Sequence, residues 1–259
     1  MIRKFLRKLL HSFRRLLFGD TLERISQRVE RLDRLQGEDY PLTQLELVVA
    51  EIDRFLKRTS VATILDVGSR DAEVAIMFKR FFPRSKVFAF ECNPRAIDLC
   101  RENIKKSRRN DIVLVDKAVS DQAGTLDFHA VDPRKWGNIG ASSLYAPTSY
   151  PAERFEKIKV EAVTLAEWAR GAGVNAVDIL WLDLQGAELK ALQGMGALAQ
   201  KVKFIYVEVE HKEMYVGQPL LPEIDSYLAA LDFTLLRNIF TVKDGSYGTS
   251  LYISNQLLQ

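Results

Sequence analysis

The sequence predicts a Rossmann-like α/β fold, in which helices cover both faces of a mostly parallel sheet. From residue 61 onward, short apolar runs alternate with stretches of helical periodicity, and this order builds such a sheet. Gly68 follows one apolar run and Glu91 ends the next, 23 residues later, which is about the length of a strand–turn–helix–strand unit. A basic, amphipathic pattern over residues 1–18 predicts a helical extension before this domain.

The individual elements are predicted from apolar runs, helical spacing and turn residues. Apolar runs predict strands at 61–67, 86–91, 112–116, 177–183, 203–208, 233–237 and 249–254. Helical spacing predicts helices at 45–56, 71–81, 94–107 and 222–231, and a further helix that begins at 187. A turn at 121–124 predicts a hairpin-like excursion over 117–131, and scattered proline and glycine predict a long loop over 132–157.

The composition is that of an ordinary globular protein with an uneven distribution of charge. The 259 residues are 47% apolar and 27% charged, which allows one substantial core. The formal net charge is +3, but residues 1–37 alone carry +6, so the remainder carries −3. We therefore predict two parts, an N-terminal segment at 1–37 and one α/β domain at 38–259.

Residues 1–18 are expected to form a helix at a membrane surface. Apolar residues recur there at helical spacing with Lys and Arg between them, and no acidic residue precedes Asp20. Such a helix can lie in the interface of an anionic membrane. Two alternatives stay open, a helix that packs on its own domain or a partner, and an organelle-targeting peptide. No apolar run reaches the ~18 residues of a membrane span and no secretory signal is visible, so we expect a cytoplasmic protein, peripheral on the membrane.

Residues 21–36 carry a short heptad-like pattern. Leu22, Ile25, Val29 and Leu32 follow one another at intervals of 3, 4 and 3 residues. This spans about two heptads, which is too short to predict a coiled coil. A homo-oligomer formed through this segment and a simple spacer are the two interpretations.

The segment from Asp66 to Ala72 is the first candidate ligand-binding turn. It follows an apolar strand, and open α/β sheets bind ligands at the carboxyl ends of their strands. Gly68 lets the backbone approach a ligand closely, and Asp66 can bind the amino group of S-adenosylmethionine. A dinucleotide site prefers G-x-G-x-x-G for its pyrophosphate, so the single glycine disfavours a nicotinamide-dependent oxidoreductase. A plain strand-to-helix turn is the alternative.

Glu91 is the second candidate, at the end of the next strand. A carboxylate at this distance from Gly68 can accept hydrogen bonds from the two hydroxyls of a ribose. A solvated strand end is the alternative for Glu91. Cys92 follows it and Cys100 lies in the next helix, and the two match neither a disulfide framework nor a metal-ligand pattern. We therefore expect packed, reduced thiols and no metal.

Acidic residues and an imidazole at the ends of later strands are the candidate catalytic groups. Asp183 ends the strand at 177–183 and would face the same edge of the sheet as the first two motifs, where it can orient the acceptor, accept a proton or hold a metal. Glu208 and His211 end the following strand, and either can serve as a general base. The alternative for Asp183 is a helix N-cap, and Glu188 is expected to interact with a helix N-terminus instead of a substrate.

Together these segments resemble the FkbM family of S-adenosylmethionine-dependent methyltransferases. The resemblance runs from about residue 64 to 254 and is carried, in order, by ILDVGSRDA (64–72), VFAFECNPRA (87–96), VDKAVSDQAGTLDF (115–128), GASSL (140–144), VTLAEW (163–168), VDILWLDLQGAELKALQGM (177–195) and IYVEVEHKEMY (205–215). It implies a class I methyltransferase sheet with S-adenosylmethionine as cofactor. It also implies O-methylation, commonly of a sugar, glycan or polyketide hydroxyl.

The resemblance assigns roles by position. The implied cofactor-binding residues share a place at the ends of the first three strands: Asp66, Gly68, Ser69, Arg70 and Asp71 at the methionine end, Glu91 and Cys92 at the ribose, and Asp116, Lys117 and Ala118 near the adenine. Asp183 would lie between the cofactor and the acceptor. Ser142 and Ser143 in the long loop would contact the acceptor.

Two motifs depart from the family pattern. D-x-G-A-N-x-G has Ser69, Arg70 and Ala72 at its last three named positions, and D-x-E-G-x-E has Gln185 for its first Glu. Loss of that carboxylate weakens a metal or base role at position 185. The main hypothesis is methylation of a glycan or small-molecule hydroxyl, and a catalytically inactive scaffold with the same fold is the alternative. Nucleic-acid methylation is disfavoured, because an apolar stripe among the basic residues suits a membrane better than phosphates.

Overall fold

The computed structural model describes residues 40–259 apart from 110 and 133. The chain divides into two compact units, Met1–Arg54 and Phe55–Gln259. The first unit contains helix α2 (Tyr40–Ile52), which begins earlier than the helix expected from residue 45, because the first turn of a helix tolerates a proline. The predicted membrane helix at 1–18 and the heptad-like segment at 21–36 lie outside the described residues. Within the described part, no helix has the length and apolar character needed to cross a membrane.

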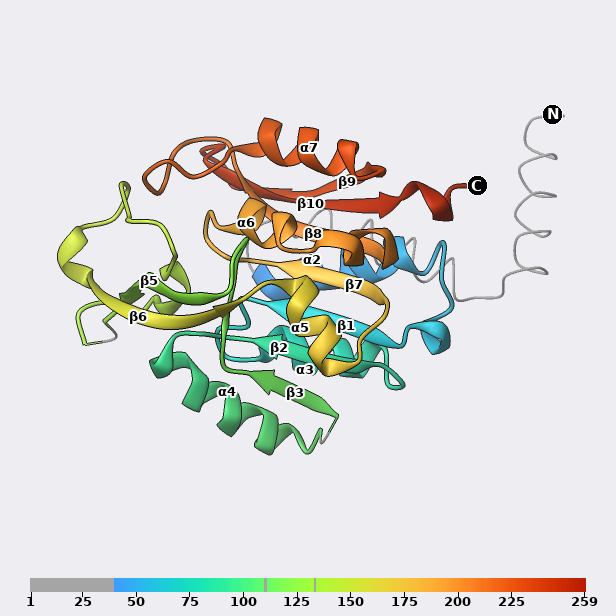
Figure 1. Cartoon of the computed structure of the whole chain (residues 1–259), viewed down its shortest axis with the longest axis horizontal. Coiled ribbons are helices and arrows are strands. Elements are labelled where there is room, and N and C mark those ends of the chain that lie inside the picture. The colour runs from blue at the N-terminus through green and yellow to red at the C-terminus, as the bar shows by residue number, and fades with distance from the viewer. Residues whose placement is uncertain (1–39, 110, 133) are drawn as a thin grey trace, which may run out of the picture. The chain divides into compact units, whose positions relative to one another are not determined.

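The second unit is built on a central sheet of seven described strands, in the order β3-β2-β1-β7-β8-β10-β9. The strands are β1 (Thr63–Val67), β2 (Lys86–Phe90), β3 (Ile112–Val115), β7 (Val177–Leu182), β8 (Val202–Glu210), β9 (Phe233–Thr241) and β10 (Tyr247–Ser254). The first five run parallel, and β10 runs antiparallel to both of its neighbours. This confirms the predicted Rossmann-like sheet and brings the carboxyl ends of β1, β2, β7 and β8 to one edge (Figure 1).

Helices cover both faces of this sheet, as predicted. They are α3 (Glu73–Phe81), α4 (Pro94–Ser107), α5 (Leu165–Ala172), α6 (Glu188–Gln193) and α7 (Leu221–Ala230). Leu180 of β7 belongs to a buried apolar cluster that α5, α6 and α7 also line. Its neighbour Trp181 contacts Phe78 of α3, with 5.6 Å between ring centroids. Because successive side chains of a strand point to opposite faces, α3 lies on the other face from α5, α6 and α7.

A smaller sheet lies beside the carboxyl ends of the central strands (Figure 1). It consists of β4 (Ala118–Val119), β5 (Gly124–Val131) and β6 (Phe155–Val163), in the order β4-β6-β5. The predicted hairpin within 117–131 is wrong, because β5 pairs antiparallel with β6 on the far side of the long loop. Neither β6 nor α5 was predicted from periodicity. Four charged residues interrupt the β6 segment FEKIKVEAV, and its partner strand is remote in sequence.

Candidate active site

Short-range hydrogen bonds close the turn after β1. The Ser69 hydroxyl donates to the carboxylate of Asp66, and both residues are buried. The backbone N–H groups of Asp71 and Ala72 donate to the Ser69 carbonyl over 2.6 and 2.8 Å. Burial raises the pKa of Asp66 to about 7, the bond from Ser69 opposes this shift, and the charge of Asp183 adds to it. A cationic ligand beside Asp66 would favour its ionised form.

Gly68 is required by a close approach of two turns. Its φ of +93° lies in the left-handed region that favours glycine. A Cβ at this position would lie 1.8 Å from the carbonyl oxygen of Asp183 and 2.8 Å from its carbonyl carbon. In the same contact the backbone N–H of Asp183 donates to the Val67 carbonyl over 3.0 Å. Gly68 therefore serves the packing of the β1 turn against the β7 turn, beyond the approach to a ligand that the sequence suggested.

Arg70 and Ala72 stand at left-handed positions of the same turn, with φ of +54° and +63°. Asn and Gly, which the family pattern places there, adopt this conformation more readily than Arg and Ala. Arg70 and Ala72 therefore add backbone strain to this turn. The Arg70 guanidinium pairs with Asp71 at 3.0 Å. Its Cδ lies close to Gly140 of the long loop, where a Cβ would come within 3.1 Å.

Glu91 follows β2, and its carboxylate accepts hydrogen bonds from the turns after β1 and β2. Its Oε1 accepts the backbone N–H groups of Cys92 and Asn93 over 2.9 and 2.7 Å, and its Oε2 accepts that of Arg70 over 2.8 Å. Glu91 is only 9% exposed, so the interpretation as a solvated strand end is wrong. Burial raises its pKa to about 7, and these three N–H donors oppose the shift. A carboxylate offers about four lone-pair positions, so one position on Oε2 is left for a ligand hydroxyl.

The two cysteines are unpaired, as predicted. Burial raises the pKa of both the Cys92 and the Cys100 thiol, and the Cys100 thiol donates to the Arg70 carbonyl over 3.3 Å. Thiols with a raised pKa are poor nucleophiles. Cys92 therefore contributes to the site through its backbone N–H on Glu91.

Asp116, Lys117 and Ala118 connect β3 to the smaller sheet. The exposed carboxylate of Asp116 pairs with the guanidinium of Arg101 on α4. Lys117 is half-buried, and Ala118 is buried where it begins β4. These residues lie at the carboxyl end of β3, on the edge of the sheet that also carries the first two turns (Figure 1).

Gln185 organises the turn after β7, with a left-handed φ of +53°. Its amide nitrogen donates to Oδ1 of Asp183 over 2.8 Å and to Oε2 of Glu208 over 2.5 Å. Its amide oxygen accepts the Tyr215 hydroxyl over 3.2 Å, and its backbone carbonyl accepts the Ser143 hydroxyl over 2.8 Å. The side chain thus joins two predicted catalytic carboxylates into one cluster.

Three buried carboxyl groups lie around Asp183. Glu188, Glu208 and Glu210 are 1%, 5% and 4% exposed. Burial raises the pKa of all three, to about 7 for Glu210, and the charge of Asp183 adds to each shift. Glu188 accepts the Leu184 backbone N–H over 2.6 Å, which agrees with its predicted interaction with the start of a helix. This environment favours the protonated forms of the buried carboxyl groups.

The structure contradicts the alternative for Asp183, whereas the catalytic role of His211 stays a prediction. The N-cap of α6 is Ala187, so the interpretation of Asp183 as a helix cap is wrong. His211 is exposed, and its backbone N–H donates to the Ser246 carbonyl over 2.8 Å, in the loop between β9 and β10. Among the residues that the structure describes, no hydrogen bond joins its imidazole to Asp183 or Glu208.

Ser142 and Ser143 anchor the long loop. The Ser142 hydroxyl donates to the Ile139 carbonyl over 2.7 Å and accepts the Val131 N–H over 3.0 Å. Ser143 is fully buried, and its hydroxyl is engaged with Gln185. The acceptor contact that the resemblance implies therefore does not fit Ser143, whose hydroxyl ties the loop to the β7 turn instead.

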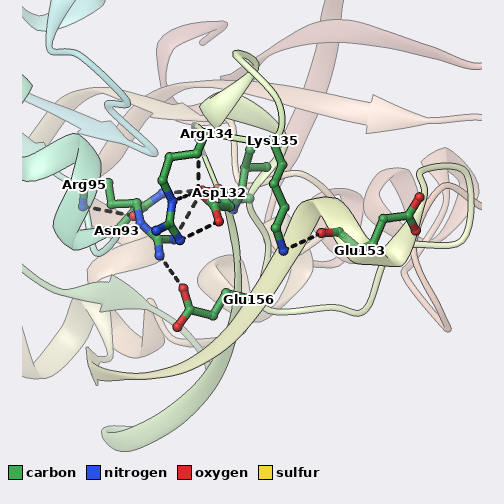
Figure 2. Close-up of polar contacts among 9 residues, drawn as sticks. Asn93, Arg95, Asp132, Arg134, Lys135, Glu153 and Glu156 are labelled. Atoms are coloured by element: carbon green, nitrogen blue, oxygen red, sulfur yellow. Dashed lines mark hydrogen bonds and ion pairs between the residues drawn. The ribbon is translucent and has the colours of Figure 1, made fainter.

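A second group of polar contacts ties the same loop to the start of α4 (Figure 2). The Arg95 guanidinium of α4 pairs with the Glu156 carboxylate at the start of β6. Arg134 donates to the Asp132 carboxylate over 2.9 and 2.8 Å, at the point where β5 leads into the loop. The Arg95 guanidinium also donates to the Val131 carbonyl over 3.3 Å, so it contacts the residues on both sides of the loop at 132–154.

Gln185 and Tyr215 are the residues whose roles the sequence did not indicate. Gln185 was visible only as a departure from a pattern, and Tyr215 only as the last residue of a family-like segment. Tyr215 is 1% exposed, and its hydroxyl also approaches the Ala141 carbonyl at 3.0 Å. Its contact with Gln185 spans 30 residues, so no local pattern reveals it. In the described part of the chain, no group of three or more His, Cys, Asp or Glu residues could hold a metal ion.

Comparison with known proteins agrees with this geometry. The family model described as "Methyltransferase FkbM domain" matches residues 66–235. The 2-O-methyltransferase NoeI of Sinorhizobium fredii is 36% identical over 172 residues, which cover 62% of this chain and 69% of NoeI. The hexuronic acid methyltransferase AglP of Haloferax volcanii is 24% identical over 183 residues, which cover 71% of this chain and 66% of AglP.

A solved structure of WbdD with a kinase inhibitor superposes with a TM-score of 0.50 at 12% identity, over 84% of this chain and 41% of WbdD. This likeness concerns the fold alone. The family match covers most of the chain and includes the turns after β1, β2 and β7. The chain therefore belongs to the FkbM family of S-adenosylmethionine-dependent methyltransferases.

Proposed function

We propose that the protein transfers the methyl group of S-adenosylmethionine to a hydroxyl of a sugar, glycan or related metabolite. The observation that carries the proposal is the contact between the turn bearing Asp183 and the turn bearing Gly68, with Asp183 and Glu208 joined through Gln185. A carboxylate beside the transferred methyl group can take the proton of an acceptor hydroxyl. The relatives support the substrate class, because one is named a 2-O-methyltransferase and the other a hexuronic acid methyltransferase.

The residues at the ends of β1 and β2 fit the cofactor chemically. Asp66 offers a buried carboxyl group to the cationic methionine end, which Gly68 and Ser69 would also line. Glu91 has one lone-pair position left, so we expect one direct ribose contact instead of the two that the sequence suggested. Residues 116–118 would lie near the adenine. When bound, the cofactor supplies an electrophilic methyl group.

Three further predicted cofactor residues act indirectly in this proposal. Arg70 and Cys92 hold the Glu91 carboxylate through their backbone N–H groups. Asp71 pairs with the Arg70 guanidinium at 3.0 Å. These contacts shape the cofactor turn without touching the cofactor.

Asp183 is the proposed general base. It accepts the hydroxyl proton as the acceptor oxygen bonds to the methyl carbon and the C–S bond breaks. Burial and the charge of Asp183 favour the protonated form of Glu208, which makes Glu208 the poorer candidate for the base. Alignment of the acceptor oxygen with the methyl group is expected to supply much of the rate enhancement.

Aromatic side chains around the long loop support a sugar acceptor. The ring centroids of Trp136 and Tyr150 are 5.1 Å apart, and those of Tyr150 and Tyr215 are 6.0 Å apart. Tyr215 in turn contacts Gln185 through its hydroxyl. Aromatic rings with polar edges suit the mixed apolar and hydroxyl surface of a sugar. The rings of Trp136, Tyr150 and Tyr215 therefore follow one another from the half-buried Trp136 to Gln185, which contacts the two carboxylates.

The test is a methyl-transfer assay with S-adenosylmethionine and a panel of neutral hexoses, hexuronic acids and glycan fragments. Formation of S-adenosylhomocysteine identifies the acceptor, and NMR of the product gives the methylated position. We expect Asp183→Asn to lower kcat by about 10²–10⁴-fold and to keep the calorimetric affinity for the cofactor.

Three other outcomes would change the proposal. Full activity of Asp183→Asn would remove this residue from the mechanism, and an equal loss in His211→Ala alone would make His211 the base. Failure of the purified chain to bind S-adenosylmethionine, measured beside NAD, would favour the inactive scaffold.

Residues 1–37 carry two further parts of the proposal. Residues 1–18 would attach the protein to an anionic membrane, and residues 21–36 would pair chains, on the strength of their sequence patterns. Sedimentation with phosphatidylserine-containing and neutral vesicles, for the full chain and a variant without residues 1–37, tests the attachment. Light scattering of the same two proteins tests self-association. Equal binding or equal mass of the two would contradict the respective role.

A further inference from the structure

Three segments that are distant in sequence meet at Gln185. Its backbone carbonyl is held by Ser143, 42 residues earlier, in the long loop. Its amide oxygen is held by Tyr215, 30 residues later, and its amide nitrogen reaches Glu208, 23 residues later. The remaining partner, Asp183, belongs to the same turn. These contacts fix both the backbone and the side chain of Gln185.

The amide of Gln185 uses its full donor capacity on two carboxylates. An amide carries two N–H donors and one acceptor oxygen. The donors face Asp183 at 2.8 Å and Glu208 at 2.5 Å, and the oxygen faces the Tyr215 hydroxyl at 3.2 Å. The reverse orientation would set the amide oxygen against two carboxylate oxygens. The contacts therefore select one orientation of the amide.

The neutral amide of Gln185 donates hydrogen bonds to two carboxylates, which a third carboxylate at this position could not do. Asp183 and Glu208 both accept a hydrogen bond from the side chain of residue 185. The buried Glu188 and Glu210 interact electrostatically with Asp183. A third carboxylate at position 185 would require a proton or a cation to offset the repulsion. Gln185 stays neutral at every pH and supplies two donors instead.

We propose that Gln185 is a positioning residue for methyl transfer, which fixes Asp183 and Glu208 relative to each other and turns the Oδ2 of Asp183 towards the acceptor hydroxyl. The inference rests on the proposed role of Asp183 as general base. The left-handed backbone of Gln185, with φ of +53°, agrees with it, because such strain persists where surrounding contacts hold it. Gly186 follows with φ of +96°, so two consecutive residues of this turn have a left-handed backbone.

The groups that interact electrostatically with Asp183 are Asp66 and Arg70 of the β1 turn, Glu188 of α6, and Tyr206, Glu208 and Glu210 of β8. The titratable Tyr215 faces Gln185 from the segment after β8. Arg70 is the cation in this described set, and its guanidinium is already paired with Asp71. If the two amide donors of Gln185 were removed, no free cation of this described set would therefore offset the repulsion between the carboxylates. The cluster would then hold protons more strongly, and activity would require a higher pH.

Gln185→Met tests the donors, because it keeps the length of the side chain and removes both N–H groups. With the acceptor found in the sugar panel, we expect kcat to fall by about 10²-fold, since small displacements of a catalytic group have effects of this size. The acidic limb of the kcat–pH profile should move to higher pH, while the Kd for S-adenosylmethionine stays at its wild-type value. Gln193→Met, the same change on an exposed residue of α6, is the matched control.

Gln185→Glu tests the charge without any acceptor. It brings three carboxylates together, so we expect it to bind Mn²⁺, seen by electron paramagnetic resonance and as a Mn²⁺-dependent rise in Tm. The wild type should show neither signal at this cluster. Circular dichroism and Tm establish that each variant is folded, and Tyr215→Phe is a second variant if Gln185→Met does not fold.

The outcomes separate the inference from the function on which it rests. An active Gln185→Met beside an inactive Asp183→Asn would overturn the positioning role alone. An active Asp183→Asn would refute the general base itself. Equal Mn²⁺ binding by the wild type and Gln185→Glu would show that the amide does not take the place of a cation.

Discussion

The turns after β1 and β7 are built from similar residues but differ in the hydrogen bonds that hold their aspartates. Each turn carries an aspartate, Asp66 or Asp183, and each has a glycine with a left-handed φ, Gly68 at +93° or Gly186 at +96°. The strands before them are paired in parallel, and the turns touch where Gly68 meets Asp183. The Asp66 carboxylate is held by Ser69 of its own turn. The Asp183 carboxylate is held by Gln185, whose side chain also contacts Glu208 and Tyr215 from distant segments.

In the proposed function, the β1 turn serves the cofactor and the β7 turn serves the acceptor. The β1 turn, in which Ser69 holds the buried Asp66, would then hold the same cofactor in every reaction cycle. The β7 turn takes its shape from the long loop and from the segment after β8, so changes in these segments can alter the acceptor side. Loops positioned by a rigid scaffold commonly carry such variable function.

The contact between the turns can be broken by Gly68→Ala, and we expect this to be the largest effect. The new Cβ would collide with the Asp183 carbonyl at 1.8 Å, and neither backbone can retreat cheaply. We expect a loss of about 3 kcal/mol or more in the free energy of unfolding, measured by urea denaturation. Gly124→Ala is the control, because Gly124 also has a positive φ but nothing lies within 4 Å of its Cβ position. An equal cost in both variants would mean that backbone strain alone, without the clash, explains the effect.

Lowering the pH should weaken cofactor binding through Asp66 and Glu91. Burial raises the pKa of both carboxyl groups to about 7, so both become protonated below this value. A cationic cofactor binds best to the ionised forms, and two such groups lower the affinity by about 10²-fold between pH 8 and pH 6. Calorimetry across this range measures the change. An affinity that does not vary with pH would show that neither group must ionise on binding.

The same two groups set the sign of the pH dependence of stability without cofactor. Their pKa values rise from 3.8 and 4.5 to about 7 on folding, so the folded state holds more protons between about pH 4 and 7. The free energy of unfolding should therefore fall as the pH rises through this window. Saturating S-adenosylmethionine should restore part of the loss at pH 7, which thermal denaturation can measure.

Ser69→Ala and Tyr215→Phe should separate the two turns functionally. Ser69→Ala removes the donor to Asp66, and we expect about a tenfold weaker affinity for S-adenosylmethionine with kcat kept at saturation. Tyr215→Phe removes the hydroxyl on Gln185, and we expect about a tenfold lower kcat with the affinity kept. Binding calorimetry and steady-state kinetics give both numbers. If each variant changed both quantities equally, the two turns would act as one unit.

Ala72→Gly should give the smallest effect and one of opposite sign. Ala72 has a φ of +63°, and glycine adopts this conformation without the steric cost of a Cβ. We expect the free energy of unfolding to rise by about 1 kcal/mol in urea denaturation. Ala229→Gly, at an exposed position within α7, should instead lower it by about 1 kcal/mol. A destabilised Ala72→Gly would mean that the Ala72 methyl contributes more by packing than it costs in strain.

The sequence predicted the fold and much of the candidate site from strand ends. Asp66, Glu91, Asp183 and Glu208 were all selected because each closes an apolar run, and parallel strands bring such residues to one edge. The same reasoning does not reveal the surroundings of His211, since its backbone N–H is held by Ser246 of the loop between β9 and β10, and its catalytic role stays a prediction. It failed for β6, whose partner strand lies beyond the long loop.

The sequence by itself determined the alternation of strands and helices in the central sheet, the glycine and the carboxylate of the β1 turn, and the resemblance to a methyltransferase family. These features depend on local periodicity and on spacings along the chain, which a sequence displays directly. The tertiary structure alone decided that Gly68 packs against the Asp183 carbonyl, that Glu91 is largely occupied by backbone donors, and that Gln185 joins two carboxylates. Those contacts join residues far apart in the chain or depend on a backbone conformation, and burial, which sets the charge of the carboxyl groups, exists only once the chain has folded.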